Sequence, residues 1–279
     1  MNNEIKILFI GDIVGKPGRK TAANYLETLK SGLIDVKPDF IIANAENASH
    51  GFGLTQKNYN ELISCGIDCL TSGNHIWDKK EIFKYIDTAH KLVRPSNYPE
   101  NTPGQGSRLF KLSDGTKIGV INILGRVFMN TLISPWEALE KEFELLRKET
   151  NIIFTDFHAE ATAEKIALGD YADELGISAF VGTHTHVQTA DEKILQNGCA
   201  YISDAGFCGT SRSVIGMDIQ SSRKYLKTGI PERFDVAESD MTELNGVSIT
   251  INKQTGHASS IERIKYVMNN NEENTTMEG

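Results

Sequence analysis

The sequence lacks any long hydrophobic run. No segment approaches the ~20 consecutive apolar residues that a membrane-spanning helix requires, and the residues are mostly mixed polar and apolar. The first residues, Met1 to Lys6, also lack the basic segment followed by an apolar stretch that is typical of a secretory signal. We therefore expect a cytoplasmic protein with no membrane partner.

Cysteine and positive charge are also scarce. The 279 residues include four cysteines, in apolar or glycine-flanked settings without zinc-ribbon spacing, which favours reduced thiols. The formal net charge is -8 and the sequence pI is about 5.4, whereas a broad grip on duplex DNA or RNA usually needs a basic face. We therefore expect no stable partner among duplex nucleic acids. Small or single-stranded substrates remain compatible with this charge, and so does a homo-oligomer.

Several familiar catalytic motifs are missing or incomplete. There is no Gly-x-Ser-x-Gly elbow of a serine hydrolase and no His-Glu-x-x-His helix of a metal-dependent peptidase or amidase. The segment from Gly11 to Pro17 resembles a phosphate-binding loop, but its glycines are four apart and Pro17 replaces the hydroxyl residue. Gly51-Phe-Gly53 lacks the third glycine of a dinucleotide-binding fingerprint.

Strand-like runs alternate with helical patterns through most of the chain. Apolar runs predict strands at residues 5–10, 40–43, 69–72, 117–123, 152–157 and 179–181, and later at 200–203, 246–252 and 261–267. Helical spacing predicts helices at residues 18–33, 55–64 with Thr55 as the N-cap, 136–148 and 161–175, and one capped by Asp78 that carries Ile82, Phe83 and Ile86. This order favours two sheets packed face to face with helices outside.

The sequence predicts one domain, which contains a long loop and is followed by a short tail. Residues 1–268 are expected to form a single domain, because the motifs described below span most of that length. Residues 94–106 carry three prolines and two glycines and predict a long loop. Residues 269–279 have no apolar spacing, so they are expected to be a disordered tail.

Five short motifs follow apolar strand-like runs and end in metal-binding or proton-carrying side chains. They lie at residues 11–12, 44–47, 73–75, 156–158 and 182–186. Carboxylate, amide and imidazole together suit Fe, Mn, Co or Zn. Taken alone, Asp12 is equally consistent with a turn cap and Asn74 with a turn residue. Glu46 is harder to explain structurally, because a carboxylate at a buried strand end is costly unless it is paired or metal-bound.

The histidines give the most specific signal. In an extended segment, His184 and His186 point to the same side, so both rings can reach adjacent metals. A single His-x-His is weak evidence, but His75 and His158 also follow strand-like runs. The other three histidines, His50, His90 and His257, fall in loop or surface-helix settings.

The order of these motifs resembles the calcineurin-like metallophosphoesterases. The segments beginning Phe9-Ile-Gly-Asp, Asn44-Ala-Glu-Asn, Ser72-Gly-Asn-His and Gly182-Thr-His-Thr-His are more closely similar to the bacterial YmdB-type phosphodiesterase group, over residues 7–267. Two departures from the superfamily stand out. Its usual Asp-x-His is here Asp12-Ile-Val, so one histidine ligand is missing, and its Gly-Asp-x-x-Asp is replaced by Asn44-Ala-Glu-Asn.

This resemblance implies a four-layer α/β/β/α sandwich with two metal ions per chain, Fe or alternatively Mn or another divalent transition metal. It implies 2′,3′-cyclic nucleotides as substrates, with 3′,5′-cyclic nucleotides as an alternative, and a link to RNA turnover. It also implies a ligand set: Asp12, Asn47 and His186 on the first metal, Asn74, His158 and His184 on the second, and Glu46 bridging both.

The expected chemistry follows from two-metal hydrolysis. A hydroxide bridging the metals attacks phosphorus while the cations neutralise charge on the phosphoryl oxygens. His75, next to a ligand, is expected to donate a proton to the leaving oxygen. Residues 203–216 are expected to cover the pocket. The competing hypothesis is a regulatory or scaffolding protein whose metal site is structural or senses a nucleotide.

Overall fold

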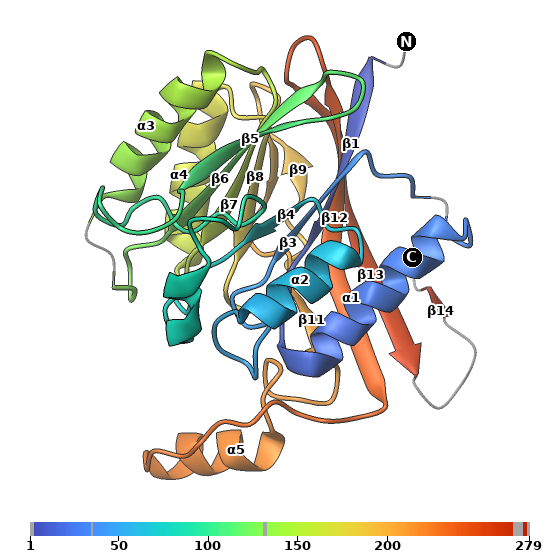
Figure 1. The fold of residues 1–279 in the computed structure, drawn as a ribbon, viewed down its shortest axis with the longest axis vertical. Coiled ribbons are helices and arrows are strands. Elements are labelled where there is room, and N and C mark those ends of the chain that lie inside the picture. The colour runs from blue at the N-terminus through green and yellow to red at the C-terminus, as the bar shows by residue number, and fades with distance from the viewer. Residues whose placement is uncertain (1–2, 35, 131–132, 270–275, 278–279) are drawn as a thin grey trace.

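Two mixed β-sheets packed face to face, with helices on both outer faces, organise the chain (Figure 1). The computed structural model describes residues 3–34, 36–130, 133–269 and 276–277. The predicted α/β class with two packed, helix-flanked sheets is therefore confirmed. Within the described residues, no helix is both long enough and apolar enough to cross a membrane.

The first sheet combines the two ends of the chain. Its order is β14-β13-β12-β1-β3-β4, with β11 pairing to both β12 and β2. The strands β1, β3 and β4 are parallel, whereas β12 runs antiparallel to β1. The strands are β1 (Glu4–Ile10), β2 (Asp12–Ile13), β3 (Phe40–Asn44), β4 (Cys69–Thr71), β11 (Phe207–Thr210), β12 (Met241–Asn252), β13 (Ala258–Asn269) and β14 (Thr276–Met277).

The second sheet is built from the middle of the chain. Its order is β5-β6-β7-β8-β10-β9. The four central strands are parallel, and the edge strands β5 and β9 are antiparallel to their neighbours. The strands are β5 (Ser107–Lys111), β6 (Lys117–Leu124), β7 (Ile153–His158), β8 (Ala179–Thr183), β9 (Lys193–Ile194) and β10 (Ala200–Ile202).

Helices α1 (Gly15–Lys30) and α2 (Gln56–Ser64) cover the outer face of the first sheet, and α3 (Pro135–Arg147) and α4 (Thr162–Leu175) cover that of the second (Figure 1). A further helix, α5 (Ile219–Thr228), lies beyond the sheets at one end of the molecule.

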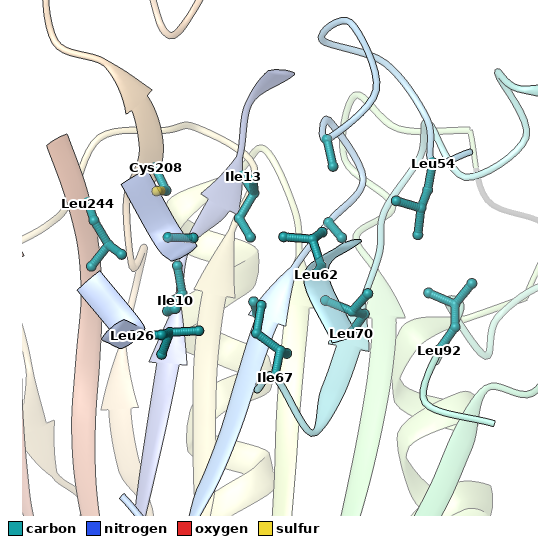
Figure 2. Packing of buried hydrophobic residues seen from close by; sticks show 14 of the residues in the cluster. Ile10, Ile13, Leu26, Leu54, Leu62, Ile67, Leu70, Leu92, Cys208 and Leu244 are labelled. Atoms are coloured by element: carbon teal, nitrogen blue, oxygen red, sulfur yellow. The ribbon is translucent and has the colours of Figure 1, made fainter. Parts of the chain in front are cut away.

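Apolar side chains fill the layers. The rings of Phe9 and Phe154 meet between the sheets, with centroids 5.2 Å apart. Figure 2 shows the layer outside the first sheet, where Leu26 of α1 and Leu62 of α2 face strand residues such as Ile10.

Of the predicted helix boundaries, one is confirmed and two need correction. Thr55 caps α2 as predicted, since its hydroxyl accepts from the Asn58 amide at 3.3 Å. Asp78 is not a cap: the element after it is a short 3₁₀ helix, Lys80–Lys84, and the Asp78 carboxylate binds His75 instead. The helix predicted to reach Leu33 ends at Lys30, because Gly32 adopts a left-handed φ of 75° and turns the chain away.

The C-terminal segment was expected to be disordered from residue 269. Asn269 instead ends β13, and Thr276–Met277 pairs with Tyr266 and Val267. The short strand β14 adds antiparallel to the outer edge of β13, as an open sheet edge allows. Residues 270–275 and 278–279 lie outside the described residues.

Candidate metal centre

Strand ends from both sheets bring the predicted site residues to the end of the molecule where α5 lies (Figure 1). In parallel strands the side chains that follow the carboxyl ends gather along one edge, and packing two such sheets brings the two edges together. The residues come from five places: Asp12 after β1, Glu46 and Asn47 after β3, Asn74 and His75 after β4, His158 at the end of β7, and His184 and His186 after β8.

One imidazole nitrogen lies at the centre of this arrangement. His158 Nε2 is 3.0 Å from Glu46 Oε1, 3.1 Å from Asn74 Oδ1 and 3.0 Å from His184 Nδ1. All four atoms carry lone pairs suited to a cation. The side chains of His158 and Glu46 are almost fully buried, so these atoms cannot be satisfied by bulk water.

The ligand atoms fall into two groups that share one carboxylate. Glu46, His158 and His184 place one ligand atom each within 4.8 Å of one another, and so do Asp12, Glu46 and His186. Sharing of Glu46 is the arrangement that a bridging carboxylate requires. Fully buried oxygens of Asp12 (Oδ1) and Asn47 (Oδ1) have no hydrogen-bond partner, which is unusual for buried polar atoms. The residues therefore fit a pair of cations of the Fe, Mn or Zn type.

Burial and mutual charge shift the pKa values of the ligands. Burial lowers the pKa of His158, but the charge and hydrogen bond of Glu46 outweigh it and raise that pKa to about 9. Burial raises the pKa of Glu46, yet His158 outweighs it and brings the value down to about 2. Burial raises the pKa of Asp12 to about 6, and burial with the charge of His158 lowers that of His184 to about 3. Cation binding should therefore release protons.

A buried network behind the site fixes the orientation of His158. Thr183 Oγ1 donates to Asp156 Oδ1 at 2.7 Å. Thr183 Oγ1 also lies 2.9 Å from His158 Nδ1. The hydroxyl proton is committed to Asp156, so Nδ1 carries a proton, and Nε2 is the nitrogen that loses its proton to offer a lone pair to a cation. Asp156 also accepts from Asn44 Nδ2 at 2.9 Å and from Thr71 Oγ1 at 2.5 Å.

This network was missed by sequence reasoning. The available signal was the position of Asp156, two residues before His158 in a predicted strand, because alternate residues share a face. Its partners come from other strands and leave no local pattern in the sequence.

The segment from His184 to His186 is not extended, in contrast to the prediction. The strand ends at Thr183, and both histidines have left-handed φ values, 102° and 64°. Such strain in non-glycine residues persists only where surrounding contacts hold it. Here Asp204 accepts from the amide and hydroxyl of Thr185 at 3.1 and 2.8 Å. The two rings therefore enter the site through a strained bend rather than through strand alternation.

His75 lies beside the ligands with one nitrogen engaged. Its Nδ1 is 2.8 Å from Asp78 Oδ2, its amide donates to Glu46 Oε2 at 3.1 Å, and its ring meets Phe52 edge to face at 4.9 Å. Gly73, just before, leaves no room for a side chain, since a Cβ there would lie 2.3 Å from Glu46 Oε2. The three histidines that were not expected to belong to the site are exposed: His50, His90 and His257.

A cavity of about 280 Å³ opens directly on the site, with Glu46, Asn47, His75, His184 and His186 in its wall. Of the loop 203–216, which was expected to cover the pocket, Val214 and Ile215 line this cavity. The rest of the cover comes from α5 and Phe234, which follow that loop. The sequence analysis did not predict α5, a helix of ten residues whose one buried residue is Ser222 and whose apolar residues, Ile219, Tyr225 and Leu226, are few and not buried.

Two packed mixed sheets with a carboxylate, amide and imidazole cluster at their strand ends define a hydrolase of the metallophosphoesterase class. Comparison with known sequences narrows this class. The YmdB-like protein family model matches residues 8–264. The chain therefore belongs to the YmdB-like family, as the motif resemblance implied.

Proteins of known sequence that are similar to this chain include phosphodiesterases. The chain is similar to the 2′,3′-cyclic-nucleotide 2′-phosphodiesterase of Bacillus subtilis, with 51% identity over 93% of this chain and 96% of that protein. A putative phosphatase/phosphodiesterase of Mycoplasma genitalium is 36% identical over 95% and 94%. The prediction that the chain is an enzyme, a phosphoric ester hydrolase of the phosphodiesterase class, is confirmed.

Solved structures match the fold over nearly the whole chain. A phosphatase from Mycoplasma pneumoniae has a TM-score of 0.87 and 35% identity, covering 96% of this chain and 95% of that one. A hypothetical protein from Thermus thermophilus has a TM-score of 0.86 and 34% identity, covering 95% and 100%.

Proposed function

We propose that this protein hydrolyses 2′,3′-cyclic nucleotides with the aid of two divalent transition-metal ions, iron or alternatively manganese. The observation that carries the proposal is the pair of ligand groups sharing Glu46. The cavity above them has the size of a small-molecule site rather than of a polymer channel. A relative of 51% identity whose name states this activity supports the choice of substrate.

We assign Asp12, Asn47 and His186 to the first ion, and Asn74, His158 and His184 to the second, with Glu46 between them. When bound, two such ions lower the pKa of water and neutralise charge on the phosphoryl oxygens.

His75 is the proton donor in this proposal. It lines the cavity, and its Nδ1 is held by Asp78 at 2.8 Å, so Nε2 is the nitrogen left for substrate. As water adds to phosphorus and releases one proton to solvent, the bond from phosphorus to one ribose oxygen breaks. That oxygen takes the proton from Nε2, which solvent then reprotonates. The Asp78 carboxylate fixes the orientation of the ring through its contact with Nδ1.

The test is a substrate panel with purified protein and added Mn. Turnover of 2′,3′-cyclic AMP to a single nucleoside monophosphate, faster than turnover of 3′,5′-cyclic AMP, is the expected result. Chelation should abolish it and metal should restore it. Turnover of 3′,5′-cyclic AMP alone would contradict the substrate assignment.

A regulatory role linked to RNA turnover, which the motif resemblance implied, is proposed in addition to the hydrolysis. Bis(p-nitrophenyl) phosphate is a general probe of the hydrolytic site, and its turnover above buffer is the expected result. We also propose a cytoplasmic location and small substrates. Its net charge of -8 opposes duplex binding, so salt-sensitive affinity for duplex DNA would count against this assignment.

A further inference from the structure

The cavity over the metal centre has two unlike walls. One wall is the set of ligands with His75. The other is apolar, and we name it the apolar hood: Phe52, Met217, Tyr225, Leu226 and Phe234. Among the described residues that line the cavity, apart from the ligands and His75, Ser222 and Tyr225 carry the polar side-chain groups, each a single hydroxyl.

The base of the hood is tied to the metal centre. The carbonyl of Ile215 accepts from His186 Nδ1 at 2.8 Å, so the segment that carries the hood also positions a proposed ligand. Met217 pairs by backbone bridges with Val214 and Val236, so the two ends of the segment that contains α5 lie side by side. Tyr225 and Phe234 then meet edge to face with centroids 5.4 Å apart.

The inner part of the hood packs on a small core, in which Met217 is buried and Phe52 and Phe234 lie against it. The outer part is open, since Leu226 and Tyr225 are 74% and 39% exposed. Ser222 is the single buried residue among those of α5. Large apolar groups left open beside a polar site are typical of a ligand wall, where apolar surface binds the body of the ligand and polar groups fix its reacting end.

We propose that the apolar hood binds the nucleobase of the substrate by stacking and shape, while the metal wall binds the phosphate. This rests on the proposed hydrolysis of cyclic nucleotides. Every base offers a π-face, so aromatic stacking is tolerant of base identity. The hood presents few donors or acceptors to base edges, and we therefore infer that the enzyme discriminates little among the four bases.

The experiment compares the four 2′,3′-cyclic nucleotides with ribose 2′,3′-cyclic phosphate, which has the same reacting group and no base. One stacked base is typically worth a factor of about 5 to 150 in affinity, so kcat/KM should exceed that of the baseless substrate by this factor. The four bases should lie within about tenfold of one another. This comparison needs no variant and is independent of whether any substitution folds.

Variants then locate the effect. Tyr225→Ala and Phe234→Ala should raise KM for cyclic nucleotides and leave kcat/KM for the baseless substrate near wild type, whereas Tyr225→Phe should behave as wild type for both. Leu145→Ala, an equally open apolar side chain on α3 at 51% exposure, is the matched control and should change neither substrate.

The outcomes separate the inference from the function on which it rests. If the wild-type enzyme hydrolyses ribose 2′,3′-cyclic phosphate as well as the nucleotides, or if the two alanine variants lose activity equally on both, the hood does not bind the base. A preference above 100-fold for one base would also overturn it, because stacking cannot supply that selectivity. If none of these compounds is hydrolysed, the proposed function falls and the inference falls with it.

Discussion

The proposed metal ligands form the floor of the cavity and the apolar hood forms its roof, and the two differ in polarity and in exposure to water. The floor is a cluster of buried and half-buried polar side chains, with His158 and Asp12 at 0% exposure. The roof is a set of apolar groups that runs from the buried Met217 to the exposed Leu226 at 74%. Buried polar groups need partners or cations, so the floor demands a fixed geometry. The roof has no such demand, which leaves it free to serve binding rather than chemistry.

The largest effect should come from the shared ligand of the floor. Glu46→Ala removes a carboxylate from both ligand groups, so kcat/KM should fall by at least about 10³-fold. The metal content should drop by more than one ion per chain. Glu144→Ala, an exposed carboxylate on α3, is the control. A Glu46→Ala protein that lost only binding affinity for nucleotides would erase the distinction between floor and roof.

The proton donor should be separable from the ligands next to it. His75→Ala should lower turnover of 2′,3′-cyclic nucleotides by ~10²–10⁴-fold and keep its metals, whereas Asn74→Ala should lose both. The deficit of His75→Ala should shrink with bis(p-nitrophenyl) phosphate, whose leaving group needs little protonation. Full activity on the cyclic nucleotide, or loss of metal, would show that His75 has another role.

The network behind the floor should act through metal affinity. Asp156→Asn disturbs the chain from Asp156 through Thr183 to His158 without touching a proposed ligand. Partners of this kind typically contribute 10–100-fold to metal affinity or activity. Titration of chelator-treated protein with Mn, followed by fluorescence, measures the change. Unaltered affinity together with a raised KM for nucleotide would assign Asp156 to substrate binding instead.

A smaller effect is expected from pH. In the metal-free protein Glu46 raises the pKa of His158 from 6.5 to about 9, so the ion pair stabilises the fold fully below about pH 6.5 and loses this contribution as the pH rises through 9. A cation needs the unprotonated ring. Its apparent affinity should therefore rise about tenfold per pH unit between pH 7 and 9. A flat affinity over that range would remove His158 from the ligand set.

The same contrast explains what the sequence could predict. Strand ends are predictable because an apolar run such as residues 5–10 stops abruptly at Gly11 and Asp12, and parallel strands bring such ends together. The strained bend at His184 was not predictable, because it is imposed by Asp204 from a distant segment.

The roof escaped prediction for a different reason. Helix α5 is ten residues long and buries Ser222 but no apolar residue, so its few apolar positions give only a short periodic signal. Its place over the cavity depends on backbone pairing at Met217 and Val236, which leaves no residue signature.

The central claim is that two cations share Glu46 at the floor of the cavity. The most direct test is the metal content of chelator-treated wild-type protein after reconstitution with Fe or Mn, measured per chain by elemental analysis. The account predicts two ions per chain. One ion or none would contradict it.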